Sequence, residues 1–122
     1  MTHRNLIDCA RVATNYLDIC EDDVISGLLS FSFDYGLNQL FCSLYKRATF
    51  AVHTFTLPSE FFTHIIKDNV TVLALMPINI TQMFDEDLRR LPSANQLQNI
   101  RVITSSGGNI TDAMLTKLEE RF

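Results

Sequence analysis

Apolar and polar residues follow one another along the chain in a pattern that predicts helices alternating with strands. Between residues 5 and 20, apolar side chains return every three or four positions, which places them on one face of a helix. Residues 24–31 then form a short, nearly continuous apolar run, which is typical of a strand buried on both faces. The same two patterns repeat over the rest of the chain.

The later segments predict three more strands and four more helices. Strands are expected at residues 49–55, 70–76 and 100–104. Helices are expected at residues 37–45 and from Pro58, Pro77 and Thr111, while residues 91–99 look like an irregular, polar connection. Because strict alternation requires right-handed crossovers, we expect one α/β subdomain over residues 1–122. Its architecture would be a three-layer α/β/α sandwich around a four-stranded parallel sheet of order 2-1-3-4.

Composition and charge remove several classes of function. The chain has a formal net charge of -4 and only 10 basic residues, so it lacks the positive surface that nucleic acids require. No apolar run approaches the roughly 20 residues that span a bilayer, and the chain opens with polar residues instead of a signal sequence. We therefore expect a cytoplasmic protein that binds neither nucleic acid nor membranes.

Cysteines and histidines give no sign of a metal centre or an activated nucleophile. Cys9, Cys20 and Cys42 lack metal-ligand spacing and lie in apolar stretches, so we expect three buried structural thiols and no metal. The histidines are scattered, without a serine or cysteine arranged beside them as a nucleophile. We expect structural roles for His53 and His64.

Chemistry in such a fold is expected beyond the carboxyl ends of the parallel strands. The turn at residues 105–109 follows the last strand and precedes a helix, so the amides around Gly107 and Gly108 suit an anion or the edge of a base. A tight strand-to-helix turn explains the two glycines as well. Asp34, after the first strand, either accepts a hydrogen bond from a substrate amine or hydroxyl or caps the following helix. Both alternatives stay open at both places.

Four short segments lie in a fixed order along these expected elements. They are Thr2-His3-Arg4-Asn5-Leu6, Ser30-Phe31-Ser32-Phe33-Asp34-Tyr35-Gly36-Leu37-Asn38-Gln39-Leu40, Val72-Leu73-Ala74-Leu75-Met76-Pro77 and Ser106-Gly107-Gly108-Asn109-Ile110. Their order and spacing resemble the landmarks of the adenylate-forming superfamily, which contains acyl-CoA synthetases, the adenylation domains of nonribosomal peptide synthetases, and luciferases. The resemblance covers essentially all 122 residues and implies an internal piece of a larger AMP-forming ligase.

The resemblance implies binding roles for two groups of residues. Phe33 stands where many members place a histidine or aromatic residue beside the reacting carboxylate, and Asp34 where amino-acid-activating members bind the substrate amine. Tyr35 and Gly36 would continue the wall of the acyl pocket. The second group would form the turn that passes close to adenine and the acyl chain: Ser106, Gly107, Gly108 and Asn109.

Two positions depart from the pattern of the superfamily. Gly36 stands where amino-acid activators carry serine, and Asn109 stands where the family turn carries alanine or glutamate. The choice between an acyl and an amino-acid substrate therefore stays open.

For function, the resemblance implies one part of an enzyme. The parent would activate a carboxylic acid with ATP and Mg²⁺ as an acyl-adenylate and pass the acyl group to CoA or a carrier thiol. The family's phosphate loop, its Tyr-Gly-x-Thr-Glu segment and the catalytic lysine of its C-terminal domain are absent from this sequence. We expect no complete set of catalytic residues, no bound cofactor and no activity for this chain alone, and self-association through its exposed surface. The alternative is a stand-alone flavodoxin-like module that binds a small ligand or a partner.

Overall fold

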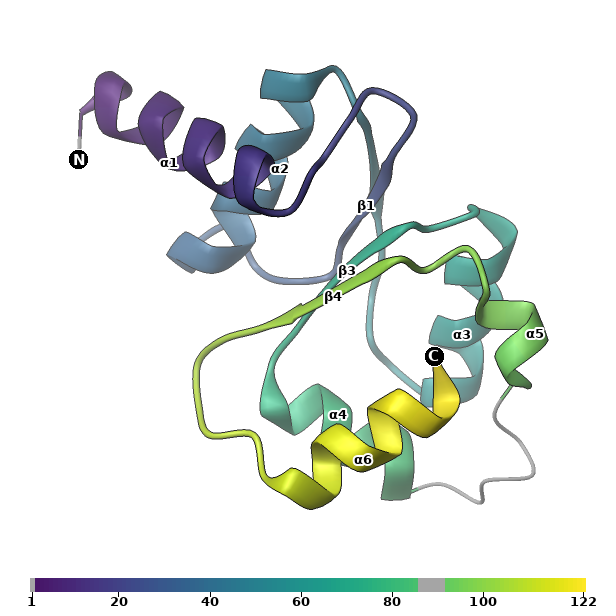
Figure 1. Ribbon diagram of the computed structural model, residues 1–122. Coiled ribbons are helices and arrows are strands. Elements are labelled where there is room, and N and C mark those ends of the chain that lie inside the picture. The colour runs from purple at the N-terminus through teal and green to yellow at the C-terminus, as the bar shows by residue number, and fades with distance from the viewer. Residues whose placement is uncertain (1, 86–91) are drawn as a thin grey trace.

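A four-stranded parallel sheet forms the centre of the computed structural model, which describes residues 2–85 and 92–122 (Figure 1). The strands are β1 (Val24–Gly27), β2 (Thr49–Val52), β3 (Val72–Leu75) and β4 (Val102–Ser105). Their order across the sheet is β2-β1-β3-β4, and every neighbouring pair is parallel. The predicted topology is confirmed, although each strand is shorter than its apolar run.

Helices cover both faces of this sheet, which confirms the predicted three layers (Figure 1). One face carries α1 (His3–Tyr16) and α2 (Asp34–Lys46). The other face carries the remaining helices: α3 (Pro58–Lys67), α4 (Pro77–Asp85), α5 (Ala94–Leu97) and α6 (Asp112–Arg121). None of the helices in the described part of the chain is long and apolar enough to cross a membrane.

Each face of the sheet has its own apolar core, because successive strand residues point to opposite faces. Val72 packs with Ala10 of α1 and Cys42 of α2, whereas Leu73 and Leu75 belong to the cluster on the other face. That larger cluster also contains Phe61, Phe62, Ile65, Val70, Ile80, Met83, Leu97 and Leu118.

Local sequence signals start several helices where they were expected. The Thr2 side chain accepts a hydrogen bond from the Asn5 amide, and Thr111 accepts one from the Met114 amide, so both threonines are N-caps. Pro58 occupies the first turn of α3, where a missing amide proton costs nothing. These signals fix the starts of α1, α3 and α6, whose buried residues belong to the two apolar cores.

The connection predicted to be irregular contains a short helix instead. Ser93 forms a capping box with Gln96 at the start of α5, and Leu97 enters the larger core at 1% exposure. The physical reason is that one buried leucine and one cap suffice for a single helical turn. Residue 91, at the start of the predicted connection, lies outside the described residues.

The prediction of three buried thiols was wrong for two of them. Cys42 is buried, but Cys9 and Cys20 are exposed. The buried stripe of α1 consists of Ala10 and Thr14, so Cys9 lies at its flank, because the helix turns about 100° per residue. Cys20 lies beyond the end of α1.

A network of hydrogen bonds joins the segments that precede β1, β3 and β4. Arg101 donates to both carboxylate oxygens of Asp23, and the Thr71 hydroxyl donates to Asp23 Oδ1 at 2.6 Å. Arg101 also donates to the carbonyl oxygens of Leu17 and Asp18, which follow α1. This network therefore holds the C-terminal end of α1 against the sheet, at the end opposite to the carboxyl ends of the strands.

Candidate functional site

A cavity of about 320 Å³ opens between α1, α2 and the carboxyl end of β4. Its lining brings Asp34 and Tyr35, from the start of α2, together with Ser106 from the glycine-containing turn. The other lining residues are Leu6, Cys9, Leu37 and Asn38. Three of the eight residues that the sequence singled out thus share one cavity.

Asp34 lies at the start of α2 but is not its N-cap, which is Phe33 and makes no side-chain hydrogen bond to the helix, while a hydrogen bond to a substrate stays a prediction. Asp34 is the first residue of α2, and its Oδ1 accepts a hydrogen bond from the Tyr35 amide at 2.8 Å. A carboxylate in the first turn also interacts favourably with the helix dipole. At the same time its exposed side chain lines the cavity, so helix stabilisation and ligand contact are compatible here.

Tyr35 connects α2 to the edge strand. Its hydroxyl lies 2.5 Å from Thr104 Oγ1 on β4, a contact between residues 69 positions apart. Burial raises the pKa of the Tyr35 phenol, although the hydrogen bond to Thr104 acts in the opposite direction. The phenol is therefore a neutral hydrogen-bonding group at physiological pH, and the contact fixes one wall of the cavity.

Gly107 brings the turn close to Phe33. The backbone of Gly107 has φ +89°, and a Cβ built on it would lie 3.8 Å from Phe33 Cζ and 3.8 Å from Met76 Sδ. A Cβ on Gly108 would lie 3.4 Å from Pro77 Cγ. The left-handed φ at Gly107 is the conformation that favours glycine, which supports the tight-turn interpretation, while a site for an anion or a base stays a prediction.

Five of the eight sequence candidates are not among the cavity lining: Phe33, Gly107 and Gly108, described above, and Gly36 and Asn109. Gly36 is buried, and a Cβ on it would lie 2.4 Å from the Ser30 carbonyl oxygen and 2.8 Å from that of Leu29. The glycine is needed there because the loop after β1 crosses directly over the first turn of α2. Asn109 is exposed at the end of the turn.

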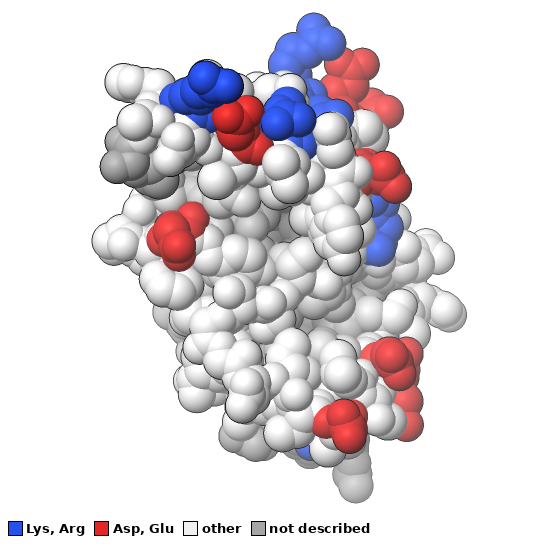
Figure 2. Space-filling view, turned by 60° about the vertical axis from the view of Figure 1, so that its left-hand side comes forward, with Lys and Arg blue, Asp and Glu red and all other residues white. Residues whose placement is uncertain are grey.

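The cavity is mostly apolar in character. Asp34 is the one charged side chain among its lining residues, and no lysine or arginine is among them. Figure 2 turns the left-hand side of Figure 1 forward and shows that most of this face is uncharged, with charged side chains at the top, along the right-hand side and at the lower right, and one acidic group at the left. Such a surface suits an uncharged, apolar body more than a polyanion.

Some contributors to the site could not be found from the sequence. Leu6 belongs to a segment that only marked the opening of a helix, and Cys9 was assigned to the core. Thr104 of β4 contacts Tyr35, and Met76, which follows β3, lies beside the Gly107 turn. Met76 belongs to one of the four segments that the sequence singled out, whereas the roles of Leu6, Cys9 and Thr104 depend on which elements meet in space.

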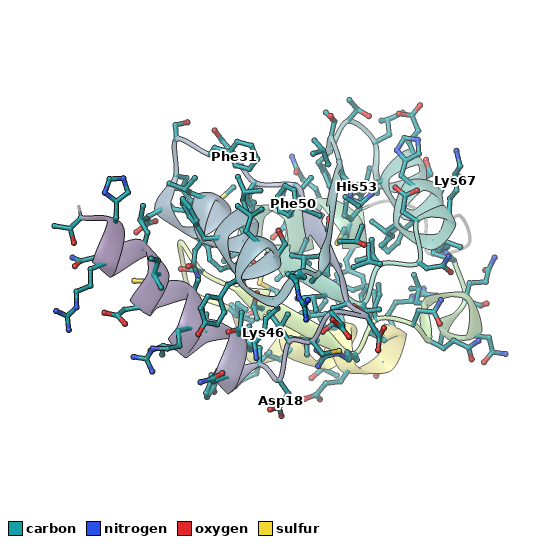
Figure 3. The ribbon with its side chains drawn as sticks, turned by 90° about the horizontal axis from the view of Figure 1, so that it is seen from above. Asp18, Phe31, Lys46, Phe50, His53 and Lys67 are labelled. Atoms are coloured by element: carbon teal, nitrogen blue, oxygen red, sulfur yellow. The ribbon has the colours of Figure 1, made fainter. Side chains whose placement is uncertain are left out.

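A second polar cluster lies elsewhere, around His53 (Figure 3). Its Nδ1 lies 2.9 Å from Ser26 Oγ, and its Nε2 lies 3.0 Å from Asp68 Oδ2. The expectation that no serine lies beside this histidine was therefore wrong, because the pairing of β1 and β2 brings together residues 27 positions apart. Ser26 is only 1% exposed, so a substrate does not reach its hydroxyl and the cluster serves packing.

Groups of three or more histidine, cysteine, aspartate or glutamate side chains that could hold a metal ion do not occur within residues 2–85 and 92–122. The residues of the cavity likewise offer only the Asp34 carboxylate as a charged oxygen ligand. This donor set does not fit Mg²⁺, which takes near-octahedral oxygen coordination from carboxylates and substrate phosphates.

Several solved structures have a fold similar to that of this chain. ATP-bound MatB from Rhodopseudomonas palustris has a TM-score of 0.84 and 18% identity, with coverage of 99% of this chain and 23% of that one. O-succinylbenzoate coenzyme A synthetase (MenE) from Bacillus subtilis, in complex with AMP, has a TM-score of 0.82 and 25% identity, with coverage of 98% and 24%. The N-terminal domain of FACL13 from Mycobacterium tuberculosis has a TM-score of 0.77 and 14% identity, with coverage of 93% and 29%.

The chain spans about a quarter of the length of these structures. A search of the curated proteins gave no significant match. The family model described as AMP-binding enzyme matches residues 1–122, which confirms the resemblance inferred from the four sequence segments. The chain therefore belongs to the AMP-binding enzyme family.

Proposed function

We propose that this chain is a fragment of an AMP-forming acyl-CoA synthetase, that it contributes part of the acyl and adenine pocket, and that it is inactive alone. The complete enzyme would activate a carboxylic acid with ATP and Mg²⁺ and transfer the acyl group to CoA or a carrier thiol, in the cytoplasm. The family match and the similarity to MenE and MatB support this proposal.

The observation that carries the proposal is the meeting of two sequence segments at one cavity. Asp34 and Tyr35 line it from α2, Ser106 lines it from the turn after β4, and Phe33 approaches Gly107 beside it. A mostly apolar cavity next to an exposed, glycine-containing turn provides adjacent places for an acyl group and an adenylate.

The same cavity supports the expectation of inactivity. Adenylation passes through a transition state in which negative charge develops on the phosphates, and cations or a metal must stabilise that charge. The lining residues include no lysine or arginine, and Asp34 would repel a phosphate. The residues that line the cavity would bind and orient an acyl group, whereas other groups must stabilise the negative charge on the phosphates.

One observation favours the related alternative, a piece of an amino-acid adenylation domain. The Asp34 carboxylate faces the cavity, and a carboxylate there attracts a substrate ammonium group. Asp34→Asn should weaken the binding of an aminoacyl-adenylate analogue and leave a fatty acyl analogue unchanged if the substrate is an amino acid. If the substitution leaves the binding of both analogues unchanged, the result would count against this alternative.

The proposed function is tested with the purified chain in two measurements. ATP–pyrophosphate exchange should be undetectable, and measurable exchange would overturn the proposed inactivity. A non-hydrolysable acyl-adenylate analogue, an acylsulfamoyl adenosine, should shift the amide resonances of Ser106 to Asn109 in an NMR titration. The residues around Asp23 lie at the opposite end of the strands and serve as the internal control. No response at the turn would overturn the proposed role in the pocket.

A further inference from the structure

We propose that Leu6 and Cys9 of α1 form the outer wall of the cavity and determine how large an acyl group it accepts. The inference rests on the proposed function, since it treats the cavity as an acyl pocket. Leu6 and Cys9 would be two specificity-determining residues on a helix for which no ligand contact was expected from the sequence.

The geometry of α1 places both side chains over the cavity. Leu6 and Cys9 are three positions apart and therefore neighbours on one side of the helix. Both line the cavity, opposite Asp34, Tyr35 and Leu37 of α2. Cys9 is exposed although its helical neighbour Ala10 is 1% exposed, so its thiol is on the cavity side of the buried stripe.

The wall is held in place by contacts outside the cavity. The Thr2 cap fixes the first turn of α1, and the Arg101 guanidinium holds the carbonyl oxygens of Leu17 and Asp18 beyond its last turn at 3.1 and 2.9 Å. Ala10 packs between these ends in a core with Cys42. A helix anchored along its length does not move away to admit a larger ligand, so the bulk of Leu6 and Cys9 limits the space.

The composition of the lining defines the class of ligand. Leu6, Leu37 and the Tyr35 ring offer apolar surface, whereas Asp34 disfavours a second carboxylate beside it. A cavity of about 320 Å³ lies at the small end of the range for ligand pockets. We therefore assign the cavity to a short or medium monocarboxylic acyl group with its apolar end against α1.

The three cysteines provide a direct test in the wild-type chain. Cys9 lies in the cavity wall, Cys20 is exposed beyond the end of α1, and Cys42 is buried. Burial and the neighbouring Cys9 thiol raise the pKa of Cys42 to about 11, so Cys42 reacts slowly with maleimide at neutral pH. A bound decanoyl-sulfamoyl adenosine should slow maleimide labelling of Cys9 at least about tenfold, roughly the effect of a ligand that excludes the reagent from its own site. The labelling rate of Cys20 should stay unchanged.

Variants of the wall test its effect on size. Leu6→Phe should weaken binding of the decanoyl analogue at least about tenfold, since a few misplaced methylenes in an apolar pocket have this effect. Binding of the butyryl analogue should change less. Ile7→Phe is the matched control, because Ile7 is the next residue of α1, is 56% exposed and does not line the cavity.

The outcomes separate the inference from the proposed function. If the decanoyl analogue shifts the Ser106–Asn109 resonances but Cys9 labelling and Leu6→Phe binding match the controls, the wall inference is wrong and the proposed function stands. If neither analogue binds the wild-type chain, the proposed function fails and the inference fails with it. The inference is confirmed if the decanoyl analogue protects Cys9 from maleimide and if Leu6→Phe weakens binding of the decanoyl analogue more than binding of the butyryl analogue.

Discussion

Asp23 is a buried carboxylate that is stable only because its partners surround it. It is 3% exposed and accepts hydrogen bonds from Arg101, Thr71 and the Cys20 amide. Burial raises the pKa of this carboxyl, but the hydrogen bonds outweigh burial and lower the pKa from its ordinary 3.8 to about 2. The ionised form therefore stabilises the fold above the ordinary pKa by about 2 kcal/mol, and this contribution is lost as the pH falls toward 2.

Asp23→Ala should lower the free energy of unfolding by about 3 kcal/mol at neutral pH, because Arg101 loses its ionic partner. The cost should shrink as the pH falls through the interval from 3.8 to about 2, where wild-type Asp23 also becomes neutral. Urea unfolding at neutral pH and at the acid end of that interval measures both values. Asp22→Ala, at an exposed neighbouring position, is the control. An equal cost at both pH values would contradict this account.

The Ser26–His53–Asp68 cluster has the residue types of a hydrolytic triad but the burial of a packing element. Ser26→Ala should cost about 1 kcal/mol of stability, since it removes one buried hydrogen bond, and His53→Ala should cost more because it leaves two partners unpaired. A fluorophosphonate probe should leave Ser26 unlabelled, which mass spectrometry of the tryptic peptides would show. Labelling of Ser26 would mean that the strand opens to solvent.

At the scale of helices and turns, glycines decide how closely α2 and the β4 turn approach their neighbours. Gly36→Ala should destabilise the chain by at least about 2 kcal/mol, because the new Cβ would lie 2.4 Å from the Ser30 carbonyl oxygen. Gly107→Ala should cost about 1 kcal/mol, since alanine is strained at φ +89°. Gly108→Ala is the matched control, with the nearest atom at 3.4 Å. Thermal unfolding of the three variants should rank them in this order, and a Gly36→Ala variant as stable as wild type would refute the crossing contact.

The elements themselves could be predicted from the sequence, whereas the contacts of the site could not. The periodic apolar residues of α1 and the β-branched run around Val72 predicted the elements and, through their alternation, the order of the strands. The first strand was predicted too long, because the chain turns away after β1, where Ser30 and Ser32 hydrogen-bond to each other. The α5 turn escaped detection because its four residues bury a single leucine.

Candidate site residues could be named from the sequence only where they carried a motif. Asp34, Tyr35 and Ser106 meet at the cavity as the carboxyl-end rule implied. Cys9 could not be placed, because a 3.6-residue period does not separate the buried stripe from its flank. The Tyr35–Thr104 contact was equally inaccessible, since it depends on how closely the start of α2 approaches β4 and on the directions of two side chains.

At the scale of the whole molecule, β4 is an edge strand with an apolar hollow beside it. All four of its residues are half-buried, and an adjoining hollow of about 260 Å³ is lined by Ile103, Ile110, Leu115, Leu118 and Phe122 among others. An uncovered edge strand next to apolar surface is prone to pair with another strand. The prediction of self-association therefore has a specific location.

Sedimentation velocity should show a concentration-dependent association of the purified chain. Leu115→Lys should shift the equilibrium toward the monomer, because it places a charge at the hollow where Leu115 is 43% exposed. Val12→Lys, at a 58% exposed position on α1, should leave the association unchanged. A chain that stays monomeric at all concentrations, or one for which both lysines act alike, would contradict the assignment of this surface.

The contact between Tyr35 and Thr104 gives the protein an optical signal of its own. The chain contains 3 tyrosines and no tryptophan, so its ultraviolet emission comes mainly from the tyrosine phenols. Tyr16 and Tyr45 are exposed on the helices, at 85% and 43%, whereas the Tyr35 ring lines the cavity and its hydroxyl is held by β4. A molecule that enters the cavity changes the surroundings of one emitter in three, and Tyr35→Phe identifies that component of the spectrum without any added dye.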